Sequence, residues 1–275
     1  MKAKLLKPTL TSLGLAVAGL FFLLPFLWMI STSLKTDAEA FSIPAHWIPR
    51  VIQWSNYKKA VTTIPFFQQT LNTLYISVMT TVGTVISSAL PAYGFARIKW
   101  PGRDALFTLV LATMMLPFAV QMIPMYVIFR QLGWVNSFKP LWVPSFFGAA
   151  FNIFLLRQFF MTIPKELSEA ARIDGLSELG IFARIIMPLS RPAVTTVAVL
   201  NFLWAWTMFL EPLIFLNDPK LYTLSLGLRA FQSAHTAQWA VLMAAGVLFT
   251  VPIVLLFFAA QRVFIEGITL TGIKG

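Results

Sequence analysis

Long uncharged intervals separate clusters of charged residues along this chain. A helix needs about 20 largely apolar residues to cross the hydrocarbon core of a bilayer, with about 17 as a lower limit. Six intervals reach that length, so the pattern predicts an all-α integral membrane protein with six transmembrane helices. We expect these helices near residues 10–33, 71–95, 106–129, 140–160, 193–210 and 239–261. The fourth is the shortest interval and contains Pro144, Gly148 and Asn152.

The composition agrees with a membrane protein. Hydrophobic residues make up 58% of the chain and charged residues 11%, whereas a soluble domain carries about 25% charged residues. The basic start of the first interval and the small residues of Ala38-Glu39-Ala40 also fit a cleaved signal peptide. The apolar core of a signal peptide is only about 7–15 residues long. The longer run found here favours an uncleaved helix.

Basic residues are distributed unequally between the two sides that six spans define. One side, which holds both termini and the segment 164–188, carries 13 of the 21 Lys and Arg residues. Such an excess marks the cytoplasmic face, so segments 35–69 and 211–238 are expected outside. The net charge of +11 then reflects basic cytoplasmic loops. We therefore expect no nucleic-acid partner.

Several function classes lack the residues that they need. The chain has no cysteine and only His46 and His235, which lie far apart, so we expect no metal site. It contains no phosphate-binding G-x-x-x-x-G-K-S/T motif. No ionisable residue lies deep in a predicted span, which disfavours an ion-coupled carrier. No nucleophile–base pair is visible, so we expect no enzyme activity. A stand-alone channel or carrier remains the alternative from another class.

The segment 164–188 is polar and lies between two apolar spans, with features of a helix–turn–helix. Thr162 is expected to cap its first helix, with Pro164 in the first turn. Gly175 occupies the position where a left-handed residue commonly ends a helix. Ser177 can cap the second helix, which we expect to end at Met187-Pro188.

The first helix of this segment carries small and acidic residues, including Glu166, Glu169, Ala170 and Ala171. Helices that rest on lipid favour large apolar residues on one face and Lys or Arg on the other. Small residues instead permit close approach of another protein, and acids attract a basic partner. The pattern favours a socket for a protein over a lipid-surface helix, which remains the alternative.

One motif in this segment resembles a known signature. Glu169-Ala170-Ala171, Gly175, nine further residues, Ile185 and Met187-Pro188 resemble the EAA motif of bacterial ABC-importer permeases, with Met187 in place of the usual Leu. The resemblance covers nearly the whole chain and is greatest to the smaller permease subunit of maltose-type importers, within the carbohydrate-uptake subfamily. The other segments that carry it are Tyr93–Arg97, Phe154–Pro164, Trp239–Met243, Gln261–Gly267 and Thr271–Gly275.

The resemblance implies a type I ABC importer permease fold with a core at 70–261. Residues 1–69 would precede this core, and 262–275 would form a cytoplasmic tail. It also implies a second, different permease, a cytoplasmic ATPase dimer that binds ATP and Mg, and an external solute-binding protein, all in a bacterial or archaeal cytoplasmic membrane. This chain would bind no cofactor. The subfamily often has an Asn-Asp pair after the fifth span, which Trp206–Pro212 lacks, so a non-sugar solute remains the alternative to a sugar.

The resemblance also implies roles for individual residues. The loop 164–188 would couple the ATPase to transport, and the tail Gly272–Gly275 would reach the same ATPase. The coupling candidates are Glu169, Ala170, Ala171, Arg172, Asp174, Gly175 and Pro188.

Polar and aromatic residues within the spans are candidates for the substrate pathway. A sugar is bound by hydrogen bonds to its hydroxyls and by aromatic faces. The same side chains can instead join helices or anchor them at the interface. The candidates are Asn72, Tyr75, Asn152, Asn201, Trp204 and Trp206. Pairs of small residues fit either contact with a second permease or packing within this chain: Gly83 with Ser87, Ala92 with Ala96, and Ala240 with Ala244.

Overall fold

The computed structural model describes residues 2–232 and 238–271, with side chains over 12–232 and 238–261. The described residues are mostly helical and include no β-strand. Packing divides the chain into two compact units. Unit 1 comprises Met1–Phe66 and Gly227–Val251, and unit 2 comprises Phe67–Leu226 and Pro252–Gly275. The predicted all-α fold is confirmed.

Unit 1 contains helices from both of its chain segments, and the last of them continues into unit 2. Its helices are α1 (Lys2–Ser33), α2 (Asp37–Ala40), α3 (Ser55–Thr62), the short η5 (Leu228–Phe231) and the start of α15 (Trp239–Thr271). The side-chain amide of Asn56 donates to the carbonyl oxygens of Ser33 at 2.9 Å and Lys35 at 2.8 Å. These carbonyls, at and just after the end of α1, have no partner inside the helix, so the Asn56 amide supplies their hydrogen bonds. Asp37 similarly accepts from the backbone N–H of Ala240 at 2.9 Å.

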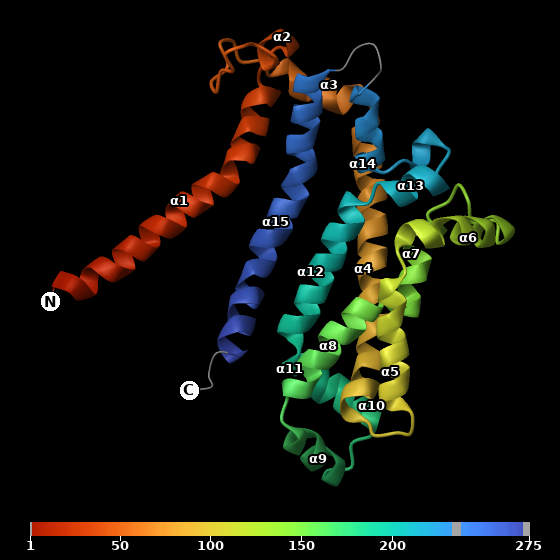
Figure 1. Ribbon diagram of the computed structural model, residues 1–275. Coiled ribbons are helices and arrows are strands. Elements are labelled where there is room, and N and C mark those ends of the chain that lie inside the picture. Colours follow the sequence, from red (N-terminus) through yellow and green to blue (C-terminus); the bar gives the residue numbers. More distant parts are fainter. Residues whose placement is uncertain (1, 233–237, 272–275) are drawn as a thin grey trace. The chain divides into compact units, whose positions relative to one another are not determined.

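Unit 2 is arranged around one long helix, α4 (Phe66–Arg97), which runs through it from end to end (Figure 1). The other elements before the 164–188 segment are α5 (Arg103–Ala112), η1 (Thr113–Met115), α6 (Phe118–Gln131), α7 (Lys139–Trp142), η2 (Val143–Phe147) and α8 (Ala150–Thr162). The later elements are α9 (Lys165–Ile173), α10 (Glu178–Ile181), η3 (Phe182–Ile186), α11 (Met187–Leu189), α12 (Arg191–Thr207), α13 (Leu210–Phe215), η4 (Pro219–Leu221) and α14 (Leu224–Gly227).

Four helices of the described chain are long and apolar enough to span a membrane, and up to six do so if each bent pair counts as one span. The four are Ser12–Ser33, Phe66–Arg97, Lys139–Thr162 and Trp239–Gln261. The predicted third span is divided, because Arg103–Met115 and Phe118–Gln131 meet at 95°. Pro117 causes the break, since a proline disfavours helical backbone in the preceding residue, and Leu116 is extended.

The predicted fourth span is also interrupted, although it still counts as one span. Gly148 has a φ of +89°, which stops η2 and allows α8 to begin at Ala150. Only glycine adopts this backbone without a steric penalty. The interruption leaves backbone N–H groups without partners inside the helix.

Hydroxyl side chains on one face of α4 pair with that interrupted backbone. Ser87 Oγ donates to the carbonyl of Ser145 at 2.8 Å and accepts from the N–H of Gly148 at 3.1 Å. Ser88 Oγ accepts from the N–H of Ala149 at 3.3 Å. Lipid offers no water to such groups, so irregular backbone at this depth must be paired within the protein. With these two serines, the stripe along α4 comprises Thr73, Ser77, Thr80, Thr84, Ser87 and Ser88, all buried except the half-buried Ser87.

The first half of α4 organises the segment after α13 in the same way. Asn72 Nδ2 donates to the carbonyls of Lys220 at 2.9 Å and Tyr222 at 3.0 Å. Thr73 Oγ1 accepts from the N–H of Leu224 at 2.8 Å, at the start of α14. One helix therefore positions two irregular segments of unit 2 that are distant in sequence.

The small-residue pairs mostly pack within the chain. A Cβ on Gly83 would come within 2.5 Å of the Phe146 ring. Ala92, Ala240 and Ala244 are buried in the described structure. Packing within one chain, one of the two expectations for these residues, is therefore confirmed for these four.

Two helix ends lie further along the chain than expected. The second helix of the 164–188 segment continues to Leu189 and then meets α12 at 78°. Within it, η3 is a single wide turn, where the N–H of Met187 bonds to the carbonyl of Phe182. Helix α15 extends past the predicted end at 261 to Thr271, and the tail Gly272–Gly275 lies outside the described residues.

Replacing Gly83 with Ala should lower the apparent melting temperature of the purified chain. The added Cβ would collide with the Phe146 ring, and such overpacking costs about 1–3 kcal/mol. Gly94→Ala is the matched control on the same helix, because its Cβ would meet no atom within 4 Å. It should leave the melting temperature unchanged or raise it. Equal effects of the two substitutions would contradict close packing of α4 on η2.

Candidate functional site

The segment 164–188 forms the predicted helix–turn–helix. Helix α9 ends before Gly175, whose φ of +82° is the expected left-handed value. Ser177 caps the next helix by accepting from the N–H of Gly180 at 3.2 Å. The expectation that Thr162 caps α9 is wrong, because Pro164 holds the N-cap position and Thr162 donates to the carbonyl of Phe159. The hydroxyl is therefore used to close α8.

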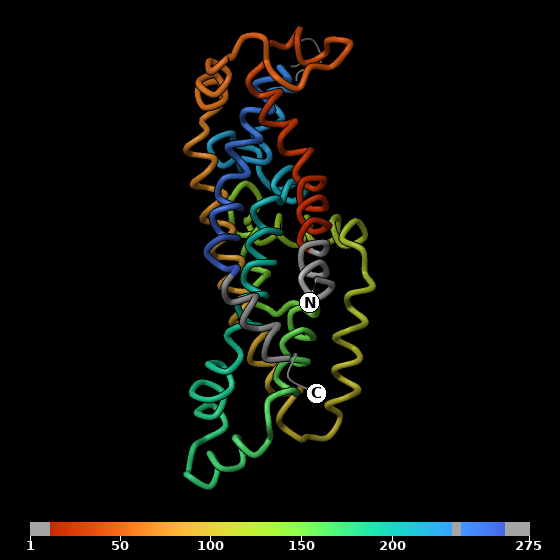
Figure 2. Tube along the Cα trace, turned by 90° about the vertical axis from the view of Figure 1, so that its left-hand side faces the viewer, coloured from red at the N-terminus to blue at the C-terminus, as the bar shows by residue number. Residues whose placement is uncertain are grey.

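This segment projects from one end of unit 2 (Figure 2) and is held there by three side chains. Tyr93 Oη donates to Glu178 Oε2 at 2.6 Å, and Arg172 Nε donates to Glu178 Oε1 at 2.6 Å. We call Tyr93, Arg172 and Glu178 the latch. The hydrogen bond from Arg172 lowers the pKa of Glu178 below its usual value, and the bond from Tyr93 lowers it further. The carboxylate is therefore charged at neutral pH. The latch ties both helices of the segment to α4.

A second attachment lies four residues further along α4. Arg97 donates from Nη2 to the carbonyl of Ile163 at 2.7 Å, at the junction of α8 with α9. Tyr93 and Arg97 lie one helical turn apart, on the same side of α4. The end of the long helix therefore grips the segment at both its start and its middle.

The outward face of α9 consists of Glu166, Glu169, Ala170 and Ile173, which follow helical spacing and are exposed. Ile173 is 87% exposed, so this face presents a large apolar side chain. Two further apolar side chains of the segment, Leu167 and Leu179, are also exposed.

The predicted coupling residues occupy different positions relative to this face. Ala171 is 5% exposed and packs into the core of unit 2, so it cannot form part of an external contact shelf. Arg172 belongs to the latch. Asp174 and Pro188 are exposed, and Gly175 forms the turn. Of the proposed close-contact alanines, only Ala170 is accessible.

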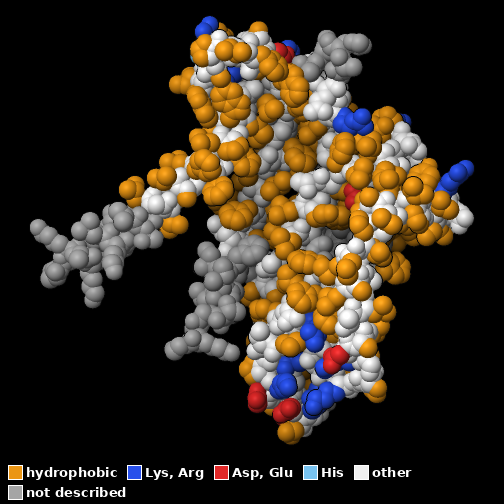
Figure 3. Space-filling view, viewed as in Figure 1, with side chains coloured by type: hydrophobic (Ala, Val, Ile, Leu, Met, Phe, Trp, Pro, Cys, Tyr) orange, Lys and Arg blue, Asp and Glu red, His pale blue; other side chains and the backbone are white. Residues whose placement is uncertain are grey.

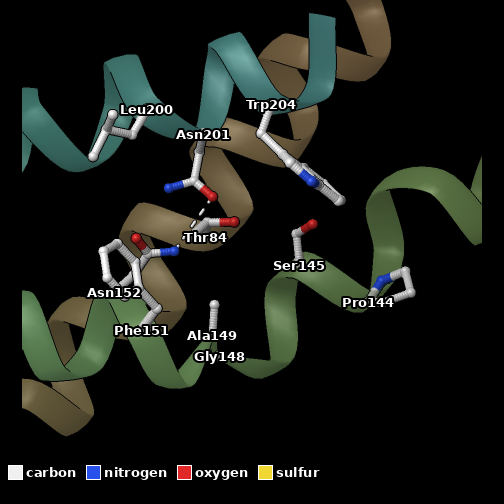
Figure 4. A pocket seen from close by; sticks show the side chains of 10 residues that line it. All are labelled: Thr84, Pro144, Ser145, Gly148, Ala149, Phe151, Asn152, Leu200, Asn201 and Trp204. Carbon is white, nitrogen blue, oxygen red and sulfur yellow. Dashed lines mark hydrogen bonds between the residues drawn. The ribbon is translucent and has the colours of Figure 1, made fainter. Parts of the chain in front are cut away.

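A pocket of about 560 Å³ lies where α8 begins, between α4 and α12 (Figure 4). Its volume is within the range of about 300–1,000 Å³ that is usual for small-molecule sites. In Figure 4, Asn152 and Asn201 point toward each other, and Asn152 Nδ2 donates to Asn201 Oδ1 at 3.3 Å. Trp204 lies one turn further along α12 and is 52% exposed. The pocket is lined by Thr84, Pro144, Ser145, Gly148, Ala149, Phe151, Asn152, Leu200, Asn201 and Trp204.

Three of the six predicted pathway residues, Asn152, Asn201 and Trp204, therefore meet in one pocket. The other three lie elsewhere. The amide of Asn72 is occupied by two backbone carbonyls. Trp206 is 1% exposed and stacks on Phe202 at a centroid distance of 5.7 Å, which excludes both a wet lining position and an interfacial belt position. Tyr75 is half exposed beside Phe138, away from the pocket lining.

Some residues at both sites escaped sequence reasoning. Thr84 and Ser145 line the pocket, but single hydroxyls in apolar spans are too common to single out. Glu178 follows the Ser177 cap in the first turn of α10, where an acid is common at any helix start. Tyr93 belongs to the segment Tyr93–Arg97 that carries part of the family resemblance.

No group of three or more His, Asp or Glu side chains in the described residues could hold a metal ion. Neither site contains a pair of side chains arranged for covalent chemistry. The geometry instead offers a binding pocket and a projecting loop that are both attached to α4.

Comparison with known proteins adds sequence and fold relationships. Residues 79–269 match the family described as "Binding-protein-dependent transport system inner membrane component". The chain is 33% identical to the sulfoquinovosyl glycerol transport system permease protein SmoH of Agrobacterium fabrum, over 95% of this chain and 91% of that one. It is 31% identical to the trehalose/maltose transport system permease protein MalG of Thermococcus litoralis, over all of both chains. It is 32% identical to the sn-glycerol-3-phosphate transport system permease protein UgpE of Salmonella typhi, over 94% of each.

A solved structure shows a similar fold. It is the crystal structure of a bacterial ABC transporter involved in import of the acidic polysaccharide alginate, and one chain of it aligns with a TM-score of 0.78. The alignment covers 95% of this chain and 98% of that one, at 22% identity.

Replacing Glu178 with Ala should loosen the segment without unfolding the rest of unit 2. The change removes the partner of Arg172 and leaves the buried hydroxyl of Tyr93 unpaired. Hydrogen exchange of the 164–188 amides should then rise roughly tenfold, since each such bond contributes on the order of 1 kcal/mol. Thr108→Ala, which removes an exposed hydrogen bond to the carbonyl of Asp104 on α5, is the control and should change nothing in this segment. Unchanged exchange in Glu178→Ala would show that the latch does not hold the loop.

Proposed function

Because the chain belongs to the family of binding-protein-dependent transport system inner membrane components, we propose that it forms half of the membrane pathway through which an importer moves a sugar. The chain is a membrane-embedded ABC importer permease subunit and not itself an enzyme. The observation that carries the proposal is the projecting helix–turn–helix, which presents Glu169 and Ala170 outward beside the left-handed Gly175.

The pocket supports a sugar as the substrate. Trp204 offers a half-exposed aromatic face, and Asn152 and Asn201 offer amides that form hydrogen bonds with hydroxyls. Apolar walls with a few placed polar groups are usual for small-molecule sites. Two of the relatives compared above are named for transport of sulfoquinovosyl glycerol and of trehalose and maltose.

A phosphate-bearing solute, like that in the name of the UgpE relative, fits the pocket less well. Such a ligand is usually held by Arg or Lys, and no basic residue lines the pocket. A stand-alone carrier is the other alternative. It would move solute when reconstituted alone, whereas we expect no transport from this chain without its partners.

The partners that we propose are a second, different permease, a cytoplasmic ATPase dimer and an external solute-binding protein. ATP and Mg would bind to the ATPase and not to this chain. The loop 164–188 and both termini would face the cytoplasm of a bacterial or archaeal cell, in agreement with the excess of basic residues on that side.

Coupling would require that the ATPase contact the loop differently in its open and closed states. The outward face of α9 offers Glu169 for a basic group and exposed Ile173 for an apolar socket. Movement of the loop would reach α4 through the latch and Arg97, and α4 contributes Thr84 to the pocket. The tail Gly272–Gly275 is proposed as a second contact with the same ATPase.

Replacing Asn152 or Asn201 with Ala should lower uptake severalfold while leaving assembly and basal ATPase activity intact. Both amides line the pocket, so their loss removes hydrogen bonds to the substrate. Asn72→Ala should instead lower the yield of folded complex, because it leaves the carbonyls of Lys220 and Tyr222 without this partner. Uptake kinetics, complex yield and ATPase activity distinguish these outcomes. Normal uptake in both pocket variants would place the substrate elsewhere.

Replacing Gly175 with Val, or Glu169 with Ala, should weaken ATPase association and reduce uptake with normal membrane insertion. At φ +82° a β-branched side chain is a steric outlier, so the turn would open. Loss of Glu169 should lower the free energy of ATPase binding by about 3–5 kcal/mol if its ion pair with the ATPase is fully buried. The loss should be about 0–1 kcal/mol if that pair is exposed.

The matched control for the turn is Gly133→Val. Gly133 has a φ of +66° with open space around it, as Gly175 has, but lies outside the loop. It should lower stability without reducing co-purification of the ATPase. Full ATPase binding and uptake in both loop variants would contradict the coupling role. That result would favour the alternative in which the segment rests on the lipid surface.

A further inference from the structure

A second pocket, of about 510 Å³, lies where the end of α4, the α4–α5 turn and α9 meet. Charged side chains gather at this end of unit 2, whereas apolar side chains cover much of its remaining visible surface (Figure 3). The lining contains five basic and two acidic side chains. They are Arg97, Lys99, Arg103, Lys165 and Arg172 on the basic side, and Glu169 and Glu178 on the acidic side.

The basic charge of this pocket is only partly neutralised. Arg172 pairs with Glu178, and Arg103 pairs with Asp104 at 2.9 Å. Lys99 and Lys165 form no ion pair within the described residues. An excess of positive charge in a partly enclosed pocket attracts an anion.

Two buried hydrogen-bond donors in the lining lack partners. Ser168 is 3% exposed, and its Oγ forms no hydrogen bond. Arg97 Nε is likewise buried and unpaired, although Nη2 of the same guanidinium is used. Buried polar groups are rarely left unpaired in native proteins, because each costs about 1–3 kcal/mol. A ligand with several acceptor oxygens would satisfy both donors.

The backbone around the pocket also favours negative charge. Lys165 and Ser168 lie in the first turn of the nine-residue helix α9, and no side chain caps this end. The start of a helix is the positive end of its dipole, with free N–H groups. The pocket also lies where the apolar interval of α4 ends, and we expect lipid headgroups at this level.

We propose that this pocket binds a phosphate-bearing anion, either the headgroup of an anionic phospholipid or free phosphate. Basic pockets beside membrane helices are suited to such headgroups. The bound oxygens would face Lys99 and Lys165 and accept from Ser168 and Arg97. The anion would join α9 to the α4–α5 turn, so it would brace the projecting loop beside the latch, whose Arg172 and Glu178 also line the pocket. This inference does not depend on the substrate that the chain carries.

The test compares binding by the full-length chain and by two variants that each lose two positive charges. Lys99→Gln/Lys165→Gln removes the unpaired lysines of the pocket. Arg184→Gln/Arg191→Gln is the matched control, because both arginines are exposed and neither lines the pocket. One arm measures phosphatidylglycerol retained against phosphatidylcholine by native mass spectrometry. The other measures thermal stabilisation by inorganic phosphate.

We expect the pocket variant to lose selective retention of phosphatidylglycerol by about fivefold per lysine, and the control to change less than twofold. Ser168→Ala should also lower retention without lowering the melting temperature of the lipid-free protein, because the hydroxyl has no partner there. The pocket variant could instead lose thermal stabilisation by inorganic phosphate while its lipid retention stays unchanged. That result would identify free phosphate as the ligand. Equal behaviour of the pocket and control variants in both arms overturns the proposal.

Discussion

The need to pair every backbone polar group in a dry environment governs unit 2. The fourth predicted span is interrupted at Gly148. The backbone groups left without helix partners there form hydrogen bonds with Ser87 and Ser88 of α4. Lipid cannot supply these partners, so the interruption exists only because a hydroxyl stripe faces it. The stop also creates the pocket, since α8 begins there and carries Asn152 into it. The pocket thus lies where hydroxyl groups of α4 pair with the interrupted backbone.

The same helix contacts both the pocket and the projecting loop of unit 2. Its middle contributes Thr84 to the pocket, and its end grips the projecting loop through Tyr93 and Arg97. Helix α4 runs without a break from Phe66 to Arg97, but Pro91 has no N–H to donate and so removes one backbone hydrogen bond between the pocket and the loop. One helix therefore connects the proposed ATPase contact with the proposed substrate pocket. Energetic coupling would require α4 to adopt two states. Binding at the pocket and binding at the loop would each have to favour one state over the other.

Sequence periodicity and composition were sufficient for the all-helical membrane fold, for most spans, and for the turn at Gly175 with its Ser177 cap. They could not predict features that depend on contacts between helices. A hydrophobic interval does not reveal that Pro117 bends it by 95°. The amides of Asn72 and Asn152 look equivalent in sequence, but one is used by backbone carbonyls and the other lines a pocket. Burial of Ala171, unlike Ala170, follows from which side of α9 meets the core.

The wide turn η3 has a consequence for comparing this chain with its relatives. In an α-helix the N–H of Met187 would bond to the carbonyl of Ala183, but here it reaches back to Phe182. The segment between Ser177 and Ser190 therefore holds one residue more than regular winding would need. A homologue that lacks one residue in this interval would keep the same end points by winding as a regular helix. A single-position gap in an alignment there marks a change of helical winding and not a loss of structure.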